Sequence, residues 1–73
     1  MELEQLQRAI EAILFAAGER VDISRLAFAL ETDERDVEAA ADALANQLNY
    51  DRRGIRILKL EKGYQMEIGR AHV

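Results

Sequence analysis

The spacing of the apolar residues changes once along this chain, and that change restricts the folds open to it. As far as Leu48, apolar residues recur three and four positions apart, which is typical of amphipathic helices. From Ile55 to Ile68 they alternate with polar residues instead, which indicates strands. A chain of 73 residues has room for one domain, so the pattern predicts a single α+β domain, residues 1–73, that is mostly helical.

Three helices are predicted before the change in spacing. The first covers residues 3–17 and ends at Gly18, a residue that readily takes the left-handed conformation of a helix cap. A short second helix covers residues 23–30, and a third runs over residues 33–48 and stops at Asn49. The apolar stripes of the three helices are Leu3, Leu6, Ile10, Ile13, Leu14 and Ala17; Leu26, Ala27 and Leu30; and Val37, Ala40, Ala41, Leu44 and Leu48.

The segments between the helices carry capping residues. Val21, flanked by charged residues, is predicted to form a very short strand. Asp22 and Thr32 are the expected N-caps of the second and third helices, because their side-chain oxygens can accept free amide hydrogens of the first turn.

Two strands, residues 55–60 and 64–68, are predicted to form a hairpin. The loop of residues 61–63 places Gly63 where a left-handed residue is expected. Alternation breaks at Leu58, which predicts either a bulge or burial on both faces of the strand. Helices followed by this hairpin predict a winged helix-turn-helix: three helices plus a C-terminal β-hairpin wing.

Residues suited to catalysis or metal binding are scarce. The chain has no cysteine, and its one histidine, His72, lies beside the last residue. Its four glycines stand at turns and form no phosphate-binding cluster. We therefore expect no enzyme, no metal and no cofactor. No apolar run approaches the roughly 18 residues of a membrane span, and no basic N-terminal segment indicates secretion, so a cytoplasmic protein without membrane contact is expected.

Charge is divided unevenly along the chain. Residues 1–49 hold eleven acids and four bases, which is −7, and residues 50–73 hold three acids and six bases, which is +3. The third helix would enter the major groove in a DNA-reading winged helix, yet it carries five acids against one base, Arg35. Because carboxylates repel phosphates, direct sequence-specific binding of nucleic acid is not expected.

The wing has the opposite charge. Its basic residues are Arg52, Arg53, Arg56, Lys59 and Lys62. They suit weak, sequence-independent contact with the DNA backbone, which is the alternative function that the sequence leaves open. Exposed strands also carry such charges simply to avoid aggregation, so the basic wing has an equally ordinary structural explanation.

Some apolar residues lie off the core stripes. On the first helix Phe15 points away from the apolar stripe. The small residues Ala12 and Ala16 lie on the side opposite that stripe, where another helix can approach closely. On the second helix Phe28 is displaced in the same way. These four residues are the candidate protein interface. The alternative is that the fold buries the first helix on more than one side, with Phe15 in the core.

The stretch from Ala9 to Leu30, AIEAILFAAGERVDISRLAFAL, resembles the start of bacterial segregation and condensation protein B. The similar features are a helix that ends in Glu-Ala-hydrophobic-hydrophobic-Phe, a Gly-Glu turn at Gly18 and a short second helix. Further on, Arg53-Gly54-Ile55 before the hairpin and Gly63-Tyr64 at the last strand are also similar to the family. Arg20 departs from the family, which often has proline there, so a rigid turn is less assured.

The resemblance implies a non-enzymatic subunit of the bacterial SMC condensin complex, which condenses and segregates chromosomes. Members form homodimers and bind the kleisin subunit ScpA, which bridges to the SMC ATPase. The family has two winged-helix domains, and this chain corresponds to the first, as an N-terminal fragment. Dimerisation is associated with that first domain and much of the kleisin contact with the second. The resemblance therefore implies that this fragment dimerises and has lost most of its affinity for kleisin.

Overall fold

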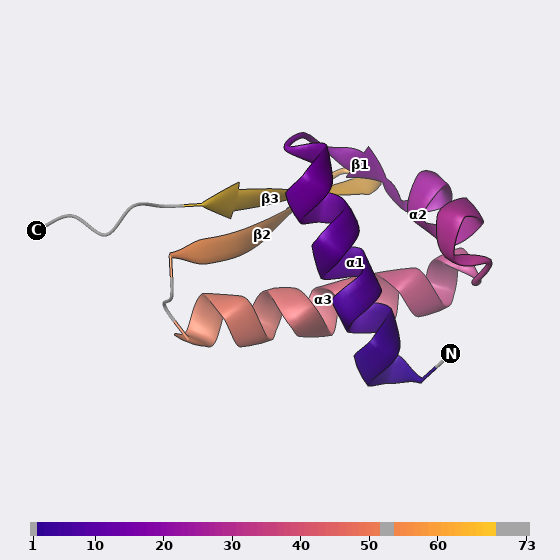
Figure 1. Cartoon of the computed structure of the whole chain (residues 1–73), viewed down its shortest axis with the longest axis horizontal. Coiled ribbons are helices and arrows are strands. Elements are labelled where there is room, and N and C mark those ends of the chain that lie inside the picture. Colours follow the sequence, from indigo (N-terminus) through magenta and orange to yellow (C-terminus); the bar gives the residue numbers. More distant parts are fainter. Residues whose placement is uncertain (1, 52–53, 69–73) are drawn as a thin grey trace, which may run out of the picture.

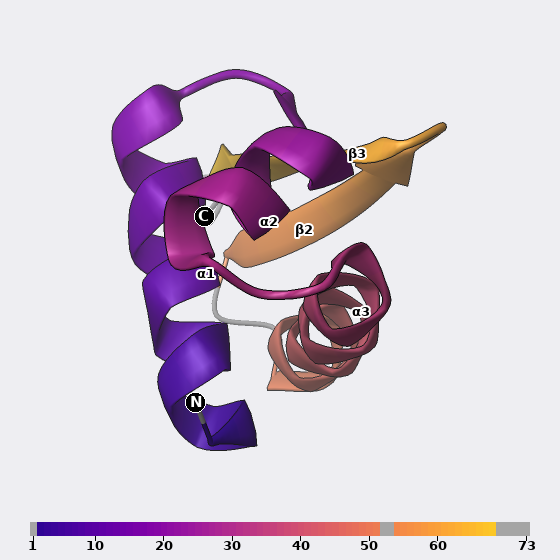
Figure 2. The same ribbon diagram turned by 90° about the vertical axis from the view of Figure 1, so that its right-hand side faces the viewer.

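The computed structural model describes residues 2–51 and 54–68, and its elements follow the order that the sequence predicts. They are α1 (Leu3–Ala17), β1 (Val21–Asp22), α2 (Ile23–Leu30), α3 (Glu34–Asp51), β2 (Ile55–Leu60) and β3 (Gly63–Ile68). Figure 1 shows α1 crossing over α3, with the β2–β3 hairpin alongside. Figure 2 shows α2 between α1 and α3. The arrangement is the predicted winged helix, with α2 and α3 as its helix-turn-helix and the hairpin as its wing.

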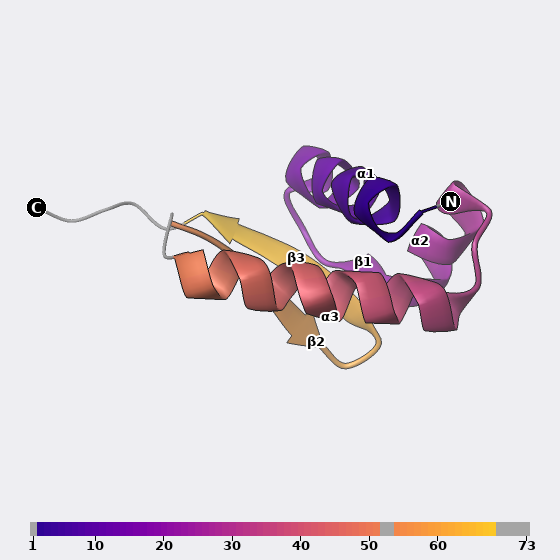
Figure 3. The same ribbon diagram turned by 90° about the horizontal axis from the view of Figure 1, so that it is seen from below.

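The sheet has the order β1-β3-β2, and both pairings are antiparallel. The hairpin strands pair one to one from Ile55 opposite Ile68 to Leu60 opposite Gly63. The register passes through Leu58 without interruption, so the predicted bulge is absent, and Leu58 is half-buried. Figure 3 shows the hairpin running beside α3, which places the wing against the acidic helix.

Gly63 has a different role from the predicted one. The left-handed residue of the hairpin loop is Glu61, with φ 55°, while Gly63 belongs to β3 and pairs with Leu60. Gly63 also pairs with Asp22 of β1. A Cβ atom built on Gly63 would lie 2.8 Å from the carbonyl oxygen of Val21. Glycine is therefore needed here because the backbone of β1 passes very close to it, and not because of its own backbone conformation.

Two helix boundaries differ from prediction. Helix α3 continues through Asn49, which has no positive φ, to Asp51. The apolar stripe ends at Leu48, so the pattern carries no signal for this last turn. Thr32 does not cap α3: its hydroxyl donates to the carbonyl of Leu30 at 3.0 Å, and the helix begins at Glu34. By contrast, Gly18 ends α1 as predicted, with φ 66° and its N–H donating to the carbonyl of Leu14.

The core lies where the three helices meet the inner face of the hairpin. Helix α1 contributes Leu6, Ile10 and Leu14, while its end residues Leu3 and Ala17 are exposed. Burying side chains of this size stabilises the fold by about 1.5–3 kcal/mol each. The other buried apolar residues are Val21, Ile23, Leu26, Val37, Ala40, Ala41, Leu44, Ile57, Tyr64 and Met66. The predicted stripes of the helices therefore supply most of this core.

Candidate protein interface

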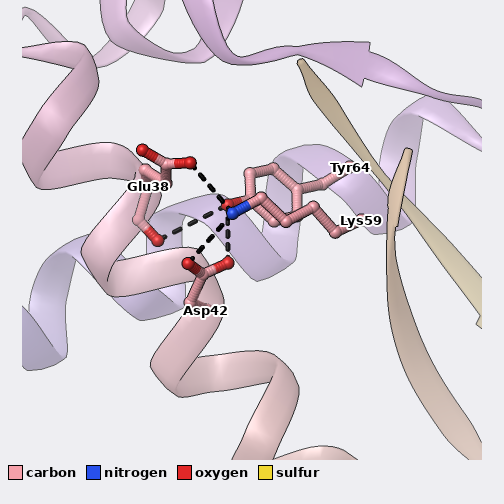
Figure 4. Close-up of polar contacts among 4 residues, drawn as sticks. All are labelled: Glu38, Asp42, Lys59 and Tyr64. Atoms are coloured by element: carbon pink, nitrogen blue, oxygen red, sulfur yellow. Dashed lines mark hydrogen bonds and ion pairs between the residues drawn. The ribbon is translucent and has the colours of Figure 1, made fainter. Parts of the chain in front are cut away.

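The acidic helix and the basic wing bind each other. The Nζ of Lys59 on β2 donates to Glu38 at 2.9 Å and to Asp42 at 3.2 Å, both on α3. From β3 the hydroxyl of Tyr64 donates to the second carboxylate oxygen of Asp42 at 2.7 Å. The ammonium group of Lys59 also lies 5.9 Å from the centre of the Tyr64 ring, within range of a cation–π contact. Figure 4 shows these four residues converging between helix and wing.

Both proton donors of this cluster hold their protons more tightly than usual. The hydrogen bonds that Lys59 donates to Glu38 and then to Asp42 raise its pKa, because they stabilise its charged form. Burial, followed by the hydrogen bond to Asp42, raises the pKa of Tyr64, because both disfavour a phenolate there. The cluster is therefore a neutral tyrosine and a charged lysine bound to carboxylates, and it connects the wing to α3.

Ion pairs within the domain neutralise some of the basic side chains that were candidates for binding nucleic acid. Arg56 is ion-paired with Glu67 across the hairpin, and Lys59 is paired with α3. Lys62 is exposed at the wing tip, and the predicted candidates Arg52 and Arg53 lie outside the described residues. The hollow between the wing tip and the helices is lined by both signs of charge: Arg20, Arg35 and Lys62 with Asp22, Glu34, Glu38 and Glu61. Such a surface does not favour phosphate, and the DNA-binding alternative gains no support from it.

Arg20 fixes the turn that the sequence left uncertain. Its Nε donates to the carbonyl of Leu60 at 3.1 Å, and its guanidinium group is ion-paired with Asp22. Asp22 therefore uses its carboxylate on Arg20, and it makes no side-chain hydrogen bond as the N-cap of α2. The side chain of Arg20 thus connects the turn before β1 to the end of β2. These side-chain contacts restrain the turn, as the ring of a proline would at the same position.

The predicted interface residues all lie on the surface. Ala12, Phe15 and Ala16 are exposed on α1, and 63% of Phe15 is accessible, so Phe15 is not part of the core. Phe28 on α2 is 87% exposed. The α1 residues lie within two turns of one helix, whereas Phe28 lies near the turn between α2 and α3. The structure therefore brings three of the four candidates together and places the fourth on another element.

Residues that sequence reasoning did not single out surround the α2–α3 turn. Glu31 at this turn has φ 52°, a left-handed conformation uncommon for residues other than glycine. Shallow hollows lie on both sides of the turn, and Glu31, Thr32 and Asp33 line both. One hollow includes Phe28 and the other the exposed Leu3. The sequence signal for this region is the run of acids at the start of α3, which also suits the positive end of the helix dipole and so does not by itself indicate a binding surface.

Metal clusters and membrane spans are both absent among residues 2–51 and 54–68. No group of three or more histidine, cysteine or acidic side chains is arranged to hold a metal ion among residues 2–51 and 54–68. Within the same ranges, no helix has both the length and the apolar character needed to cross a membrane. The described surface carries large exposed apolar side chains and charged groups, which suit contacts between proteins.

Comparison with known sequences identifies a family. The model of the segregation and condensation complex subunit ScpB matches residues 8–72. Segregation and condensation protein B of Lachnoclostridium phytofermentans is 38% identical over 66 residues, an alignment that covers 90% of this chain and 35% of that protein. The protein of the same name from Alkaliphilus oremlandii is 33% identical over 72 residues, with 99% and 39% covered. This chain thus spans between a third and two fifths of the length of these relatives.

Solved structures agree with the sequence comparison. A crystal structure of a dimer of the ScpB N-terminal domain complexed with an ScpA peptide matches with a TM-score of 0.83 and 28% identity. That match covers 93% of this chain and 85% of the solved chain. ScpB from Mycobacterium tuberculosis matches with a TM-score of 0.86 and 28% identity, over 97% of this chain and 44% of that one. Since the family model covers nearly the whole sequence and the fold agrees, this chain belongs to the family of the segregation and condensation complex subunit ScpB.

Proposed function

We propose that this chain serves the SMC condensin complex as part of a non-enzymatic accessory subunit in chromosome condensation and segregation. It works in the cytoplasm at the nucleoid, forms a homodimer, and binds the kleisin ScpA and through it SMC. This revises the expectation that the first domain has lost most of its affinity for kleisin, because a solved ScpB N-terminal domain is in complex with an ScpA peptide. The observation that carries the proposal is the match over 93% of the chain to an ScpB N-terminal domain whose structure is a dimer with an ScpA peptide. The surface supports a binding role, since its notable features are exposed apolar residues and ion pairs.

The dimer contact that we propose lies on α1. Phe15 is 63% exposed, and Ala12 and Ala16 beside it have side chains too small to hold a partner helix away. In a two-fold symmetric dimer one surface patch meets its own copy, so each contact occurs twice. A domain of this size also buries a modest share of its surface when it folds, so a second copy adds useful apolar burial.

Sedimentation equilibrium of wild type and Phe15→Asp tests this contact. The wild type should dimerise in the micromolar range, and the substitution should weaken the dimer by about thirtyfold, the effect of losing an interface residue worth about 2 kcal/mol. Gln5→Asp, at another exposed position of α1, is the matched control and should leave the dimer intact. Circular dichroism should show that Phe15→Asp stays folded.

Two outcomes would contradict the α1 dimer. If the wild type stays monomeric at high micromolar concentration, the chain does not form the proposed dimer. A Phe15→Asp protein that dimerises like the wild type moves the contact elsewhere on the surface. Unfolding of Phe15→Asp would instead show that Phe15 supports the domain from within, which contradicts its exposure.

A further inference from the structure

Phe28 is the most exposed of the large apolar side chains in the described part of the chain. It is 87% accessible, while Leu3, Phe15, Leu60 and Ile68 range from 39% to 63%. The fold does not require a phenylalanine at this position, because α2 is held to the core by Ile23 and Leu26 on its other side. Single exposed apolar residues are common on protein surfaces, so Phe28 indicates a contact only together with the charged groups beside it.

Phe28 has a basic neighbour on one side and an acidic surface on the other: Arg25 precedes it by one turn on α2, and the hollow towards the α2–α3 turn is acidic. This hollow is lined by Glu31, Asp33 and Glu34, together with Ser24, Ala27 and Thr32, and by no lysine or arginine of the described ranges. The hollow across the turn adds Asp36 and the exposed Leu3, again without a basic residue among those that the structure describes. Arg35 lies between two of these acids in the sequence but lines the hollow on the wing side instead.

The carboxylates of this rim are not engaged within the domain. No ion pair or side-chain hydrogen bond among the described residues involves Glu31, Asp33, Glu34 or Asp36. Glu38 and Asp42, further along α3, are by contrast already bound to Lys59. Negative charge that no described side chain pairs with thus lies on the α2–α3 side of the exposed phenylalanine, and it repels nucleic acid and acidic protein surfaces alike.

We propose that Phe28 and the acidic α2–α3 turn form a docking surface for a basic amphipathic segment of another protein. An apolar side chain of the segment packs on Phe28, and its lysine or arginine residues face Glu31, Asp33 and Glu34. A second copy of this chain fits the charge less well, because two of the three described wing bases, Arg56 and Lys59, are already paired within their own domain and Lys62 is left as a single charge.

This surface goes beyond the proposed dimer and is separate from it. Leu3 and Leu6 are the α1 residues that line the hollow across the α2–α3 turn, and Phe15 lies twelve and nine residues further along the same helix. At 1.5 Å per residue these separations are about 18 and 14 Å along the axis. The dimer face and the acidic surface can therefore be occupied at the same time, and each can be removed without the other.

An NMR titration of the 73-residue chain tests the surface. The probe is a synthetic helical peptide of about 18 residues with leucine on one face and lysine on the other. Amide shifts should concentrate at Phe28, Glu31, Asp33 and Glu34. Phe28→Ser should weaken binding about tenfold, as expected when an aromatic anchor is lost. Phe15→Ser, the matched control, should bind within about twofold of wild type and separates this surface from the dimer face.

Charge is tested with a second variant and a second peptide. Glu31→Gln combined with Asp33→Asn and Glu34→Gln should weaken binding and flatten its salt dependence, because the screened charges are gone. The same peptide with glutamate in place of lysine should not bind. Shifts that map elsewhere, unchanged affinity of a folded Phe28→Ser protein, or equal binding of the acidic peptide would each overturn the proposal. The proposal would also be overturned if the chain self-associates and Phe28→Ser abolishes that association, because the occupant of the surface would then be a second copy of this chain.

Discussion

Removing the hydroxyl of Tyr64 isolates the contact between the wing and α3. The ring of Tyr64 is fully buried, and its hydroxyl donates to Asp42 at 2.7 Å. Tyr64→Phe keeps the ring and its packing and deletes this one hydrogen bond. Asp42 retains the ammonium group of Lys59 at 3.2 Å, so the substitution leaves no buried charge without a partner.

The size of the effect follows from these surroundings. A hydrogen bond to a charged group contributes about 1.5–3 kcal/mol to the free energy of unfolding. The side chain of Asp42 is 45% exposed, so water replaces part of the lost donor and solvent screens part of the charge. We therefore expect a loss at the low end, about 1–1.5 kcal/mol. For a domain of this size that lowers Tm by roughly 5–10 °C.

Urea denaturation followed by circular dichroism measures this loss, with a lower midpoint and an unchanged m-value expected. Asp42→Ala and the double variant complete a mutant cycle, and the two sites should couple by about 1 kcal/mol. A Tyr64→Phe protein within about 0.3 kcal/mol of wild type, or a coupling energy near zero, would refute the reasoning. Either result would mean that the hydroxyl contact contributes nothing beyond the packing of the ring.

Two further predictions follow from the same part of the molecule. Gly63→Ala should cost about 1–3 kcal/mol, because the added Cβ meets the carbonyl oxygen of Val21 at 2.8 Å and forces β1 away; a urea midpoint equal to that of wild type would contradict it. The pKa values of Lys59 and Tyr64 are raised in the folded protein, so the folded state holds these protons more tightly than the unfolded state. Their contribution to stability should therefore be constant up to about pH 10 and fall above it. Urea midpoints measured from about pH 8 to pH 11 check this, and Tyr64→Phe should fall less steeply; a parallel decline would exclude Tyr64 as a source.

Local residue chemistry was enough to predict most of the secondary structure. Helix α2 occupies Ile23–Leu30 as predicted, and Gly18 ends α1 in the left-handed conformation. These features are decided by neighbours a few residues away, through apolar spacing and the backbone freedom of glycine. The exposure of Phe28 is of the same kind, since it was predicted to lie off the apolar stripe of its own helix. The candidate apolar residues of the interface could therefore be chosen from the sequence.

Contacts between distant segments decided the rest. Gly63 is constrained by the backbone of Val21, 42 positions earlier, and not by its own turn. Sequence spacing carries no record of that approach. Likewise, the acids of α3 and the bases of the wing are 17 and 21 residues apart, and only the packing of β2 against α3 pairs them. By itself, then, the sequence determined the helices and strands, the helix residues that face the core, and the sign of each charged segment. The tertiary structure decided which charges neutralise each other and which remain for a partner, because electrostatic interactions depend on distances in space that the order of residues does not contain.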